Sequence, residues 1–390
     1  MSSGPFIQEY AAAMSRPAGW KHLFSHSLAA QAPGISFSAH GHHLWPDVTL
    51  EAQLAAWRDA SALAGGKWDK VLGPVWEEAQ GHVALELNLP DPRTVVFAGN
   101  AHDLLVRIFS AIAAKPVQIL SSRQEFLSAM RQFRRWEETG DAIVTLVDAE
   151  DMVEAAATRQ FDLIYLSQIF YDSGHESTWR RLATYARPEG PWVVIDGYHG
   201  FMAVPTDLGE VADHIFYIAG GYKYAMSGEG VGILHAPPDF GPRPRITGWF
   251  AETNQSDVSP NTSVRFARDA RRFLGSTFDP SGLYRFNAVR RMLQEQSLTT
   301  ETIGKYVREL QLTFIAGAEM LDLEFVRPRN GRSSARFLAY RGAEAMQFSQ
   351  RLAAQGIEVD ARGKLLRIGF SIYHDVEDVE RLVKATLIRS

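Results

Sequence analysis

The sequence predicts an α/β protein with a large domain, built on a mixed and mainly parallel seven-stranded sheet flanked by helices, and a smaller C-terminal α+β domain. Three observations predict this fold. The chain has 390 residues, enough for two hydrophobic cores. Seven short apolar segments lie between about residues 95 and 236. From residue 280 onward the pattern changes to two helices followed by short strands and amphipathic helices.

The seven apolar segments are often β-branched and are bounded by turn residues, as expected for strands buried on both faces. Most are separated by segments with helical spacing, which favours parallel strands with crossover helices. The last two are joined by only ten residues, 221–230, so we expect them to pair antiparallel. The predicted strands are Val95–Gly99, Val117–Ser121, Ile143–Asp148, Leu163–Gln168, Trp192–Gly197, His214–Gly220 and Val231–Ala236.

The C-terminal part combines short strands with amphipathic helices near 342–355 and 375–388. Its predicted strands are Leu323–Arg327, Arg336–Tyr340, Ile357–Asp360 and Leu365–Ser371. Residues 1–55 carry little sheet signal and are expected to pack on the other parts. The predicted organisation is therefore an N-terminal segment (1–55), a large domain (56–279) and a small domain (280–390).

Composition narrows the functional classes. The net charge is −5 and no basic tract is present, which argues against a nucleic-acid partner. The chain has no cysteine, so disulfides, thiolate metal sites and a cysteine nucleophile are excluded. The N-terminus does not resemble a secretion signal, and no apolar run approaches the ~18 residues that span a bilayer. We expect a soluble, cytoplasmic protein.

Three features along the predicted sheet point to one chemistry. Asp196 ends the fifth strand, where an open α/β sheet binds ligands. Lys223 lies in a glycine-rich loop after the sixth strand. Residues 95–109 form a strand, a Gly-Asn turn and a helix start, where the backbone N–H groups of Ala101 and His102 would hold a phosphate while Asp103 faces away. Each feature is common alone. Together they match the lysine, carboxylate and anion site that pyridoxal 5′-phosphate (PLP) requires.

These segments also resemble the class V aminotransferases of PLP fold type I, closest to the kynureninase-like branch. The resemblance runs from about residue 95 to the end and is sharpest in VVIDGYHG (193–200) and FYIAGGYKYAMSGEGVGIL (216–234). It implies that Lys223 forms the Schiff base and that Asp196 contacts the pyridine nitrogen. Further cofactor contacts that it implies are His199, Tyr222, Phe126, Ser128, Ser167, Trp249, Ser276 and Thr277.

The same resemblance makes predictions about the substrate and the assembly. In LLRIGFSIYHDVEDVERLV (365–383), Arg367 is implied to bind the substrate α-carboxylate. Ser276 and Thr277 lie in a loop that reaches the neighbouring subunit's cofactor in relatives, which implies a homodimer with shared active sites. Residues 36–46, SFSAHGHHLWP, replace an element that holds kynurenine. His40 and His42 there are candidate substrate contacts; a structural role for this loop, or less readily a metal site with His43, stays open.

The predicted function is an enzyme that binds an amino acid through a Schiff base with PLP (the external aldimine) and removes the Cα proton, with Lys223 and Asp196 as catalytic residues. Amino-group transfer is the first expected outcome. A kynureninase-like hydrolase or another side-chain lyase is the alternative, and a non-catalytic PLP-fold binding protein is the second. A nicotinamide oxidoreductase is excluded because no G-x-G-x-x-G follows the early strands.

Overall fold

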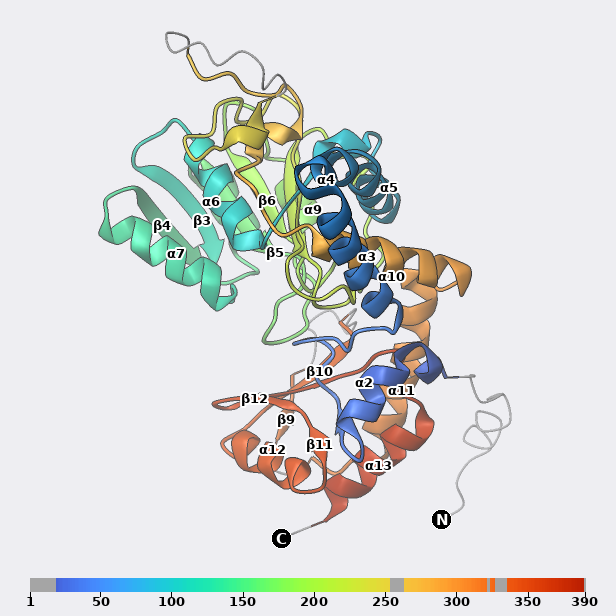
Figure 1. Ribbon diagram of the computed structural model, residues 1–390. Coiled ribbons are helices and arrows are strands. Elements are labelled where there is room, and N and C mark those ends of the chain that lie inside the picture. The colour runs from blue at the N-terminus through green and yellow to red at the C-terminus, as the bar shows by residue number, and fades with distance from the viewer. Residues whose placement is uncertain (1–18, 253–262, 321–322, 327–334, 389–390) are drawn as a thin grey trace.

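A computed structural model of the chain describes residues 19–252, 263–320, 323–326 and 335–388. Figure 1 shows two parts of unequal size, a large sheet flanked by helices and a smaller group of C-terminal strands and helices. The chain passes from the smaller part to the larger one before α3 (Val48–Leu63) and returns after α10 (Ser281–Glu295).

The large sheet has seven strands in the order β2-β8-β7-β6-β5-β3-β4. Only β8 runs antiparallel to its neighbours β2 and β7; the other neighbouring pairs are parallel. This confirms the predicted mixed sheet and the antiparallel pairing of its last two strands. The strands are β2 (Val95–Ala98), β3 (Val117–Ser122), β4 (Ala142–Val147), β5 (Leu163–Ser167), β6 (Trp192–Asp196), β7 (Ile215–Gly220) and β8 (Gly232–His235).

The helices that connect these strands cover the sheet. α6 packs on β7 and β8, α7 on β4, α8 on β3, and α9 on β5 and β6. Their bounds are α6 (Ala101–Ala111), α7 (Leu127–Glu138), α8 (Met152–Thr158) and α9 (Trp179–Ala183). Every residue of β2, β5, β7 and β8 is buried, as strands covered on both faces require. The parallel strands β3, β5 and β6 end at the same edge, where Ser167 lies opposite Asp196.

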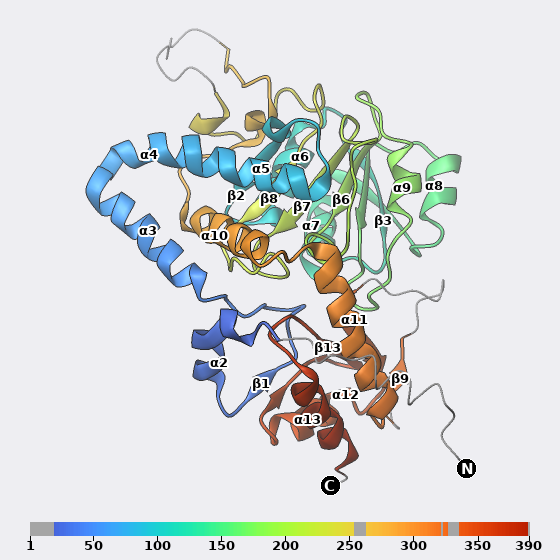
Figure 2. The same ribbon diagram turned by 90° about the vertical axis from the view of Figure 1, so that its right-hand side faces the viewer.

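A long helical arm precedes the sheet. It consists of α3 (Val48–Leu63), α4 (Lys67–Lys70), the π-helical turn η3 (Val71–Val75) and α5 (Trp76–Leu87). Gly73 has non-helical dihedrals and Pro74 follows it, so the direction changes at this turn. α10 packs against α3 and α5, which places it beside the large sheet (Figure 2). The predicted division at residue 280 stays a prediction.

The smaller part contains a four-stranded antiparallel sheet in the order β12-β13-β10-β9. Its strands are β9 (Glu324–Phe325), β10 (Phe337–Arg341), β12 (Asp360–Arg362) and β13 (Leu365–Gly369), and its helices are α11 (Thr300–Gly317), α12 (Ala345–Ala353) and α13 (Val376–Leu387). α11 runs from the large part down to α13 (Figure 2). Arg327, the last residue of the first strand predicted here, lies outside the described residues.

One strand prediction in this part is corrected. The segment expected as a single strand, 357–360, is divided into β11 (Ile357–Glu358) and β12. β11 pairs in parallel with β1 (Ile35–Ser36), so the N-terminal segment does contribute a short strand. Val359 is buried between the two, and the chain changes pairing partner there.

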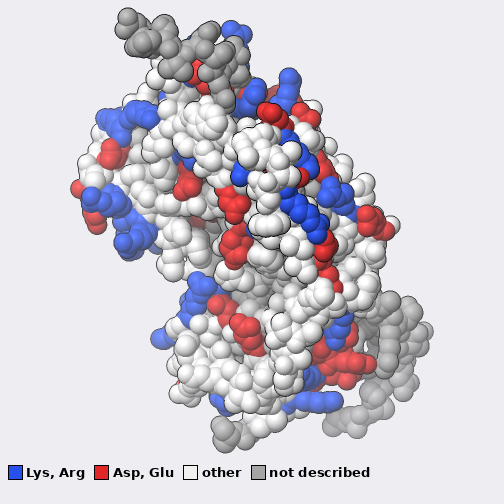
Figure 3. Space-filling model, in the orientation of Figure 1, with Lys and Arg blue, Asp and Glu red and all other residues white. Residues whose placement is uncertain are grey.

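The remaining N-terminal elements and turns are short. α2 (Ser25–Gln31) lies near α13 and β1 in Figure 2. The 3₁₀ turns are η1 (Lys21–Phe24), η2 (Ala64–Gly66), η4 (Pro92–Thr94), η5 (Trp249–Ala251) and η6 (Ala270–Phe273). Among the described residues, no helix combines the length and the apolar character that crossing a membrane requires. Figure 3 shows basic and acidic side chains interspersed over one face, in keeping with the small net charge.

Candidate active site

A cavity of about 270 Å³ lies at the carboxyl edge of the large sheet. Its size is near the lower end of the ~300–1,000 Å³ range of small-molecule sites. The wall combines apolar and aromatic side chains with a few polar groups. The lining residues are Asn100, Ala101, His102, Leu105, Phe126, Ser128, Ala129, Tyr165, Ser167, Ile169, Tyr171, Asp196, Tyr198, His199, Ile218, Tyr222 and Lys223. Nine of the predicted site residues therefore share one cavity.

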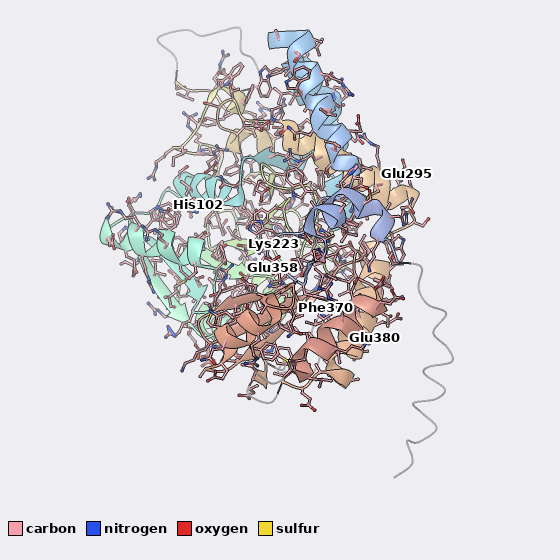
Figure 4. The ribbon with its side chains drawn as sticks, turned by 60° about the horizontal axis from the view of Figure 1, so that its bottom comes forward. His102, Lys223, Glu295, Glu358, Phe370 and Glu380 are labelled. Atoms are coloured by element: carbon pink, nitrogen blue, oxygen red, sulfur yellow. The ribbon has the colours of Figure 1, made fainter. Side chains whose placement is uncertain are left out.

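Lys223 enters this cavity from the loop that follows β7 and lies near the middle of the molecule (Figure 4). The residue is 6% exposed. Burial lowers the pKa of its amine to about 7, although Asp196 acts in the opposite direction. Its Nζ lies 2.5 Å from Nε2 of His199, whose pKa burial lowers well below the usual range. At neutral pH a large fraction of this amine is therefore uncharged and nucleophilic.

Asp196 is fixed from two sides at the end of β6. The Tyr165 hydroxyl donates to its Oδ2 at 2.5 Å, and the backbone N–H of Tyr198 donates to its Oδ1 at 2.9 Å. Burial raises the pKa of the carboxyl group, and the two hydrogen bonds oppose that shift. A buried carboxylate with fixed orientation is suited to a cationic ring nitrogen in the cavity.

The helix α6 begins at the cavity wall. Asn100 is its N-cap and accepts from the backbone N–H of Asp103 at 2.9 Å. Ala101 and His102, the two predicted phosphate contacts, line the cavity, whereas Asp103 lines a different one. A Cβ on Gly232 would lie 2.3 Å from the carbonyl carbon of Asn100, so glycine is required where β8 approaches this helix start. The first turn of α6 can therefore face an anion.

Phe126 and Tyr171 form an aromatic wall. Their rings meet edge to face with centroids 5.5 Å apart, and the Lys223 Nζ lies 5.7 Å from the Phe126 centroid. Ser128 lines the same wall. Phe126 is thus able to contact a flat ring in the cavity, as the sequence resemblance implies.

A pair of phenols forms another part of the wall. The Tyr198 and Tyr222 rings lie 5.1 Å apart, their hydroxyl groups are hydrogen bonded, and burial raises the pKa of both. Gly220 makes room for the Tyr198 ring, because a Cβ there would lie 2.1 Å from the phenol oxygen. Exposed His42 stacks on Tyr222 at 5.0 Å, so it lies behind the cavity wall rather than in it.

Arg367 does not line this cavity. Its guanidinium forms an ion pair with Asp360, with Nε donating to Oδ2 at 2.8 Å, and its Nη1 donates to the Tyr171 carbonyl at 2.9 Å. Tyr171 separates Arg367 from the cavity. His40 is fully buried 3.7 Å from Asp360, and burial lowers its pKa to about 3. The predicted substrate contacts Arg367 and His40 thus lie next to the cavity. Both contact Asp360, which already neutralises the Arg367 guanidinium.

Ser276 and Thr277 line a second cavity of about 380 Å³, together with Gly99 and Asp103. Trp249 is half exposed, and its Nε1 donates to Thr277 Oγ1 at 3.3 Å. Within one subunit these three predicted cofactor contacts are therefore separate from the Lys223 cavity. His43, the third histidine of the N-terminal loop, is buried and hydrogen bonded to Ser371 and the Leu44 carbonyl.

Sequence reasoning missed several residues of the site. Tyr165 and Ser167 share one face of β5, so the two-residue period of that strand was a usable signal. Nothing local identified Glu125, since its partner Ser167 lies 42 positions away. Asp360 was missed although its partner Arg367 lies only seven positions along the chain, on the neighbouring strand β13. The missed residues are Asn100, Leu105, Glu125, Ala129, Tyr165, Ile169, Tyr171, Tyr198, Ile218 and Asp360.

Comparisons with known proteins identify the family and the fold. The family model described as aminotransferase class-V matches residues 70–382. No curated protein matches the sequence. The fold is shared with the cystine C–S lyase C-DES, solved with its product cysteine persulfide (TM-score 0.79, 16% identity, 93% of this chain and 100% of that chain). It is also shared with the cysteine desulfurase CsdA from Escherichia coli (TM-score 0.76, 19% identity, 94% and 96%) and a cysteine desulfurase from Thermococcus onnurineus NA1 (TM-score 0.76, 18% identity, 95% and 97%).

Proposed function

The chain belongs to the class V aminotransferase family, and from that premise we propose that it removes the Cα proton of an amino acid with Lys223 as the base. PLP is the cofactor of this family. The predicted family and fold type I are confirmed, while the kynureninase-like branch stays a prediction. The observation that carries the proposal is the buried amine of Lys223, in contact with His199 and in one cavity with Asp196.

The residues present fit the cofactor. A buried lysine of lowered pKa, a fixed carboxylate and the start of α6 line one cavity. Lys223 would hold the cofactor covalently, Asp196 would face its ring nitrogen, and the N–H groups of Ala101 and His102 would face its phosphate. When bound, PLP supplies an electron-withdrawing ring that makes the Cα–H of an attached amino acid acidic.

Protein groups supply the proton transfers. Lys223 accepts the Cα proton at its Nζ and returns it later, which requires the uncharged amine that burial favours. His199 stays neutral and orients that nitrogen from 2.5 Å. Tyr165 and the Tyr198 N–H hold the Asp196 carboxylate in one orientation. Base and carboxylate are thus kept in place before substrate arrives.

The cavity wall favours a substrate with an uncharged side chain. Among the described lining residues, Lys223 is the only lysine or arginine, so a second substrate carboxylate has no guanidinium or further amine to pair with. Five of the lining side chains are aromatic: Phe126, Tyr165, Tyr171, Tyr198 and Tyr222. Arg367 would receive the α-carboxylate after Tyr171 or Asp360 releases part of its guanidinium.

Amino-group transfer to a 2-oxo acid is our first candidate outcome. Side-chain elimination is the second, favoured by the hydrogen-bonded phenols of Tyr198 and Tyr222, which keep their protons at neutral pH and can protonate a leaving group. If a C–S bond were cleaved, the sulfur would leave on a small molecule, because the chain has no cysteine to carry it.

A homodimer with shared active sites is part of the proposal. Trp249, Ser276 and Thr277 lie away from the Lys223 cavity of their own subunit, beside a second cavity. We propose that they complete the cofactor site of a second copy. Sedimentation should find a dimer, and mixing K223A subunits with T277A subunits should restore part of the activity that each variant lacks. A monomer with full activity would remove this part of the proposal.

The deciding experiment reconstitutes the protein with PLP, records its absorbance, reduces it with borohydride and maps the modified peptide. Label on Lys223 is the expected result. Amino acids with uncharged side chains are then supplied with and without a 2-oxo acid. Consumption that depends on the 2-oxo acid identifies transfer, whereas release of ammonia and a 2-oxo product without it identifies elimination. A protein that stays colourless with added PLP contradicts the proposal.

A further inference from the structure

A carboxyl group that the proposed reaction does not use lies directly behind the cavity wall. Glu125 connects β3 to α7, immediately before Phe126, and is 2% exposed. Three donor groups converge on it. The Ser167 backbone N–H lies 3.1 Å from both carboxyl oxygens, the Ser167 hydroxyl lies 2.5 Å from Oε2, and the Ser122 hydroxyl lies 3.1 Å from Oε1.

The charges around Glu125 favour its neutral form. Within the described part of the chain, no lysine, arginine or histidine is ion-paired with it. The groups that face it are Ser122 from β3, Ser167 and the Tyr165 phenol from β5, and the Asp196 carboxylate from β6. Two carboxyl groups so close in a buried site do not both ionise readily. Asp196 has the nearby amine of Lys223 as an opposing charge and Glu125 has no such cation, so the proton belongs on Glu125.

This assignment agrees with the effect of burial, which raises the pKa of Glu125 to about 8 against the opposing hydrogen bonds from Ser167. The position of the proton determines what Ser167 offers to the cavity. An ionised Glu125 is only an acceptor, so the Ser167 hydrogen must point toward it. A protonated Glu125 donates to Ser167 Oγ instead, and the Ser167 hydrogen is then free to point into the cavity that Ser167 lines.

We propose that Glu125 is a positioning residue which, in its protonated form, makes Ser167 a hydrogen-bond donor toward an anionic oxygen of the PLP bound in the cavity. This rests on the proposed function for the identity of the ligand. The proposal gives the site two carboxyl groups with different charges. Asp196 lines the cavity as an anion, and Glu125 lies behind the lining residues as a neutral acid. Its contacts with Ser167 and Ser122 also fix the loop that carries Phe126.

The first test uses the protein without cofactor, so it does not depend on the proposed function. A carboxyl group whose folded-state pKa is raised contributes stability that is complete below the unfolded value and lost as the pH rises through the folded value. Wild-type protein should therefore lose thermal stability relative to E125Q from about pH 4.5 to about pH 8, and the difference should level above that. Parallel melting curves across this range would overturn the assignment of the proton.

The second test measures the PLP dissociation constant against pH by absorbance and fluorescence. The amide that E125Q introduces cannot ionise and still donates to Ser167, so this variant should keep its affinity above pH 8, where the wild type should bind about tenfold more weakly. Below pH 8, S167A should bind PLP about tenfold more weakly than the wild type, and above pH 8, where the wild type has lost the same contact, the two should bind equally. Adding E125Q to S167A should change nothing further. S122A is the matched control, because Ser122 contacts Glu125 but does not line the cavity.

The outcomes separate the two proposals. A wild type that binds no PLP contradicts the proposed function, whereas the melting comparison still tests Glu125. A wild type that binds PLP while E125Q retains the wild-type pH dependence overturns the inference. Full affinity in S167A would do the same.

Discussion

The two ends of the candidate site are built differently. At the carboxyl edge of the large sheet, Lys223, Asp196 and His199 line an open cavity. In the smaller sheet, Arg367 of the inner strand β13 is bonded to Asp360 of β12 and to the Tyr171 carbonyl, with His40 buried beside them. The first region presents reactive groups to a ligand, and the second has satisfied its charges internally. A sequence motif can therefore identify a candidate binding residue without revealing that its side chain is already paired within the protein.

Lys223 and Arg367 differ in whether the protein itself supplies an opposite charge to the buried side chain. Burial lowers the pKa of the Lys223 amine to about 7, so a large fraction of it is uncharged at neutral pH and needs no ion-pair partner. A guanidinium stays charged, and burying it without an acid would cost several kcal/mol. Asp360 supplies that acid, and the contact with Arg367 and His40 holds the pKa of its carboxyl below its usual range despite burial. A substrate carboxylate must therefore compete with Asp360 for Arg367, whereas no acid in the described part of the chain is ion-paired with Lys223.

The largest effect expected is at Lys223. Lys223→Ala should remove the covalent link to the cofactor and reduce turnover by at least ~10²–10⁴-fold, the usual contribution of a positioned acid–base group. The residue lies in a loop, so melting temperature should change little. Absorbance with borohydride trapping measures the covalent link, and single-turnover kinetics measure the loss of turnover. Trapping of PLP in the variant at the wild-type level would show that another residue carries it.

The next effect separates Arg367 from Asp360. Arg367→Ala should raise KM for amino acids by roughly 10–100-fold, since charge-assisted hydrogen bonds contribute about 1.5–3 kcal/mol, and should leave PLP affinity unchanged. Asp360→Asn removes the internal acid and should lower the unfolding free energy by about 3 kcal/mol. A carboxylate ligand then replaces the missing charge. It should raise the melting temperature of Asp360→Asn more than that of the wild type; an equal rise would show that Arg367 does not bind carboxylates.

The pH dependence of cofactor loading sharpens the contrast further. Only the uncharged amine of Lys223 attacks an aldehyde, and its fraction grows as the pH rises. The loading rate should therefore increase about tenfold per pH unit below about pH 7 and level above it. Stopped-flow absorbance with protein lacking cofactor measures this rate. An unperturbed lysine predicts a rate that keeps rising to about pH 10.

The smallest effect concerns the phenol pair. Tyr198→Phe and Tyr222→Phe each remove one hydroxyl and keep the ring, so the cavity should survive and the melting temperature should fall only slightly. If a phenol protonates the leaving group, elimination should slow by at least tenfold while amino-group transfer stays within about threefold. Product analysis for both reactions gives the ratio, and an unchanged ratio would remove the phenols from the chemistry.

How far the sequence predicts this protein depends on the range of the interactions involved. The seven strands of the large sheet were predicted within one residue or so, because each is an apolar segment bounded by turn residues. The strand predicted over 357–360 was wrong as a single element. Its first half pairs with residues 35–36, more than 300 positions away, and no local pattern encodes such a partner.

The sequence by itself determined the fold class, the family and the nine residues that share the Lys223 cavity, since strand-end motifs and their order are local features of the chain. Only the tertiary structure decided which charges are available. Asp360 neutralises Arg367 from a neighbouring strand, and Glu125 reaches Ser167 across 42 positions. The pKa and partner of a buried group depend on burial and on neighbours that folding brings together, and the linear sequence specifies neither directly.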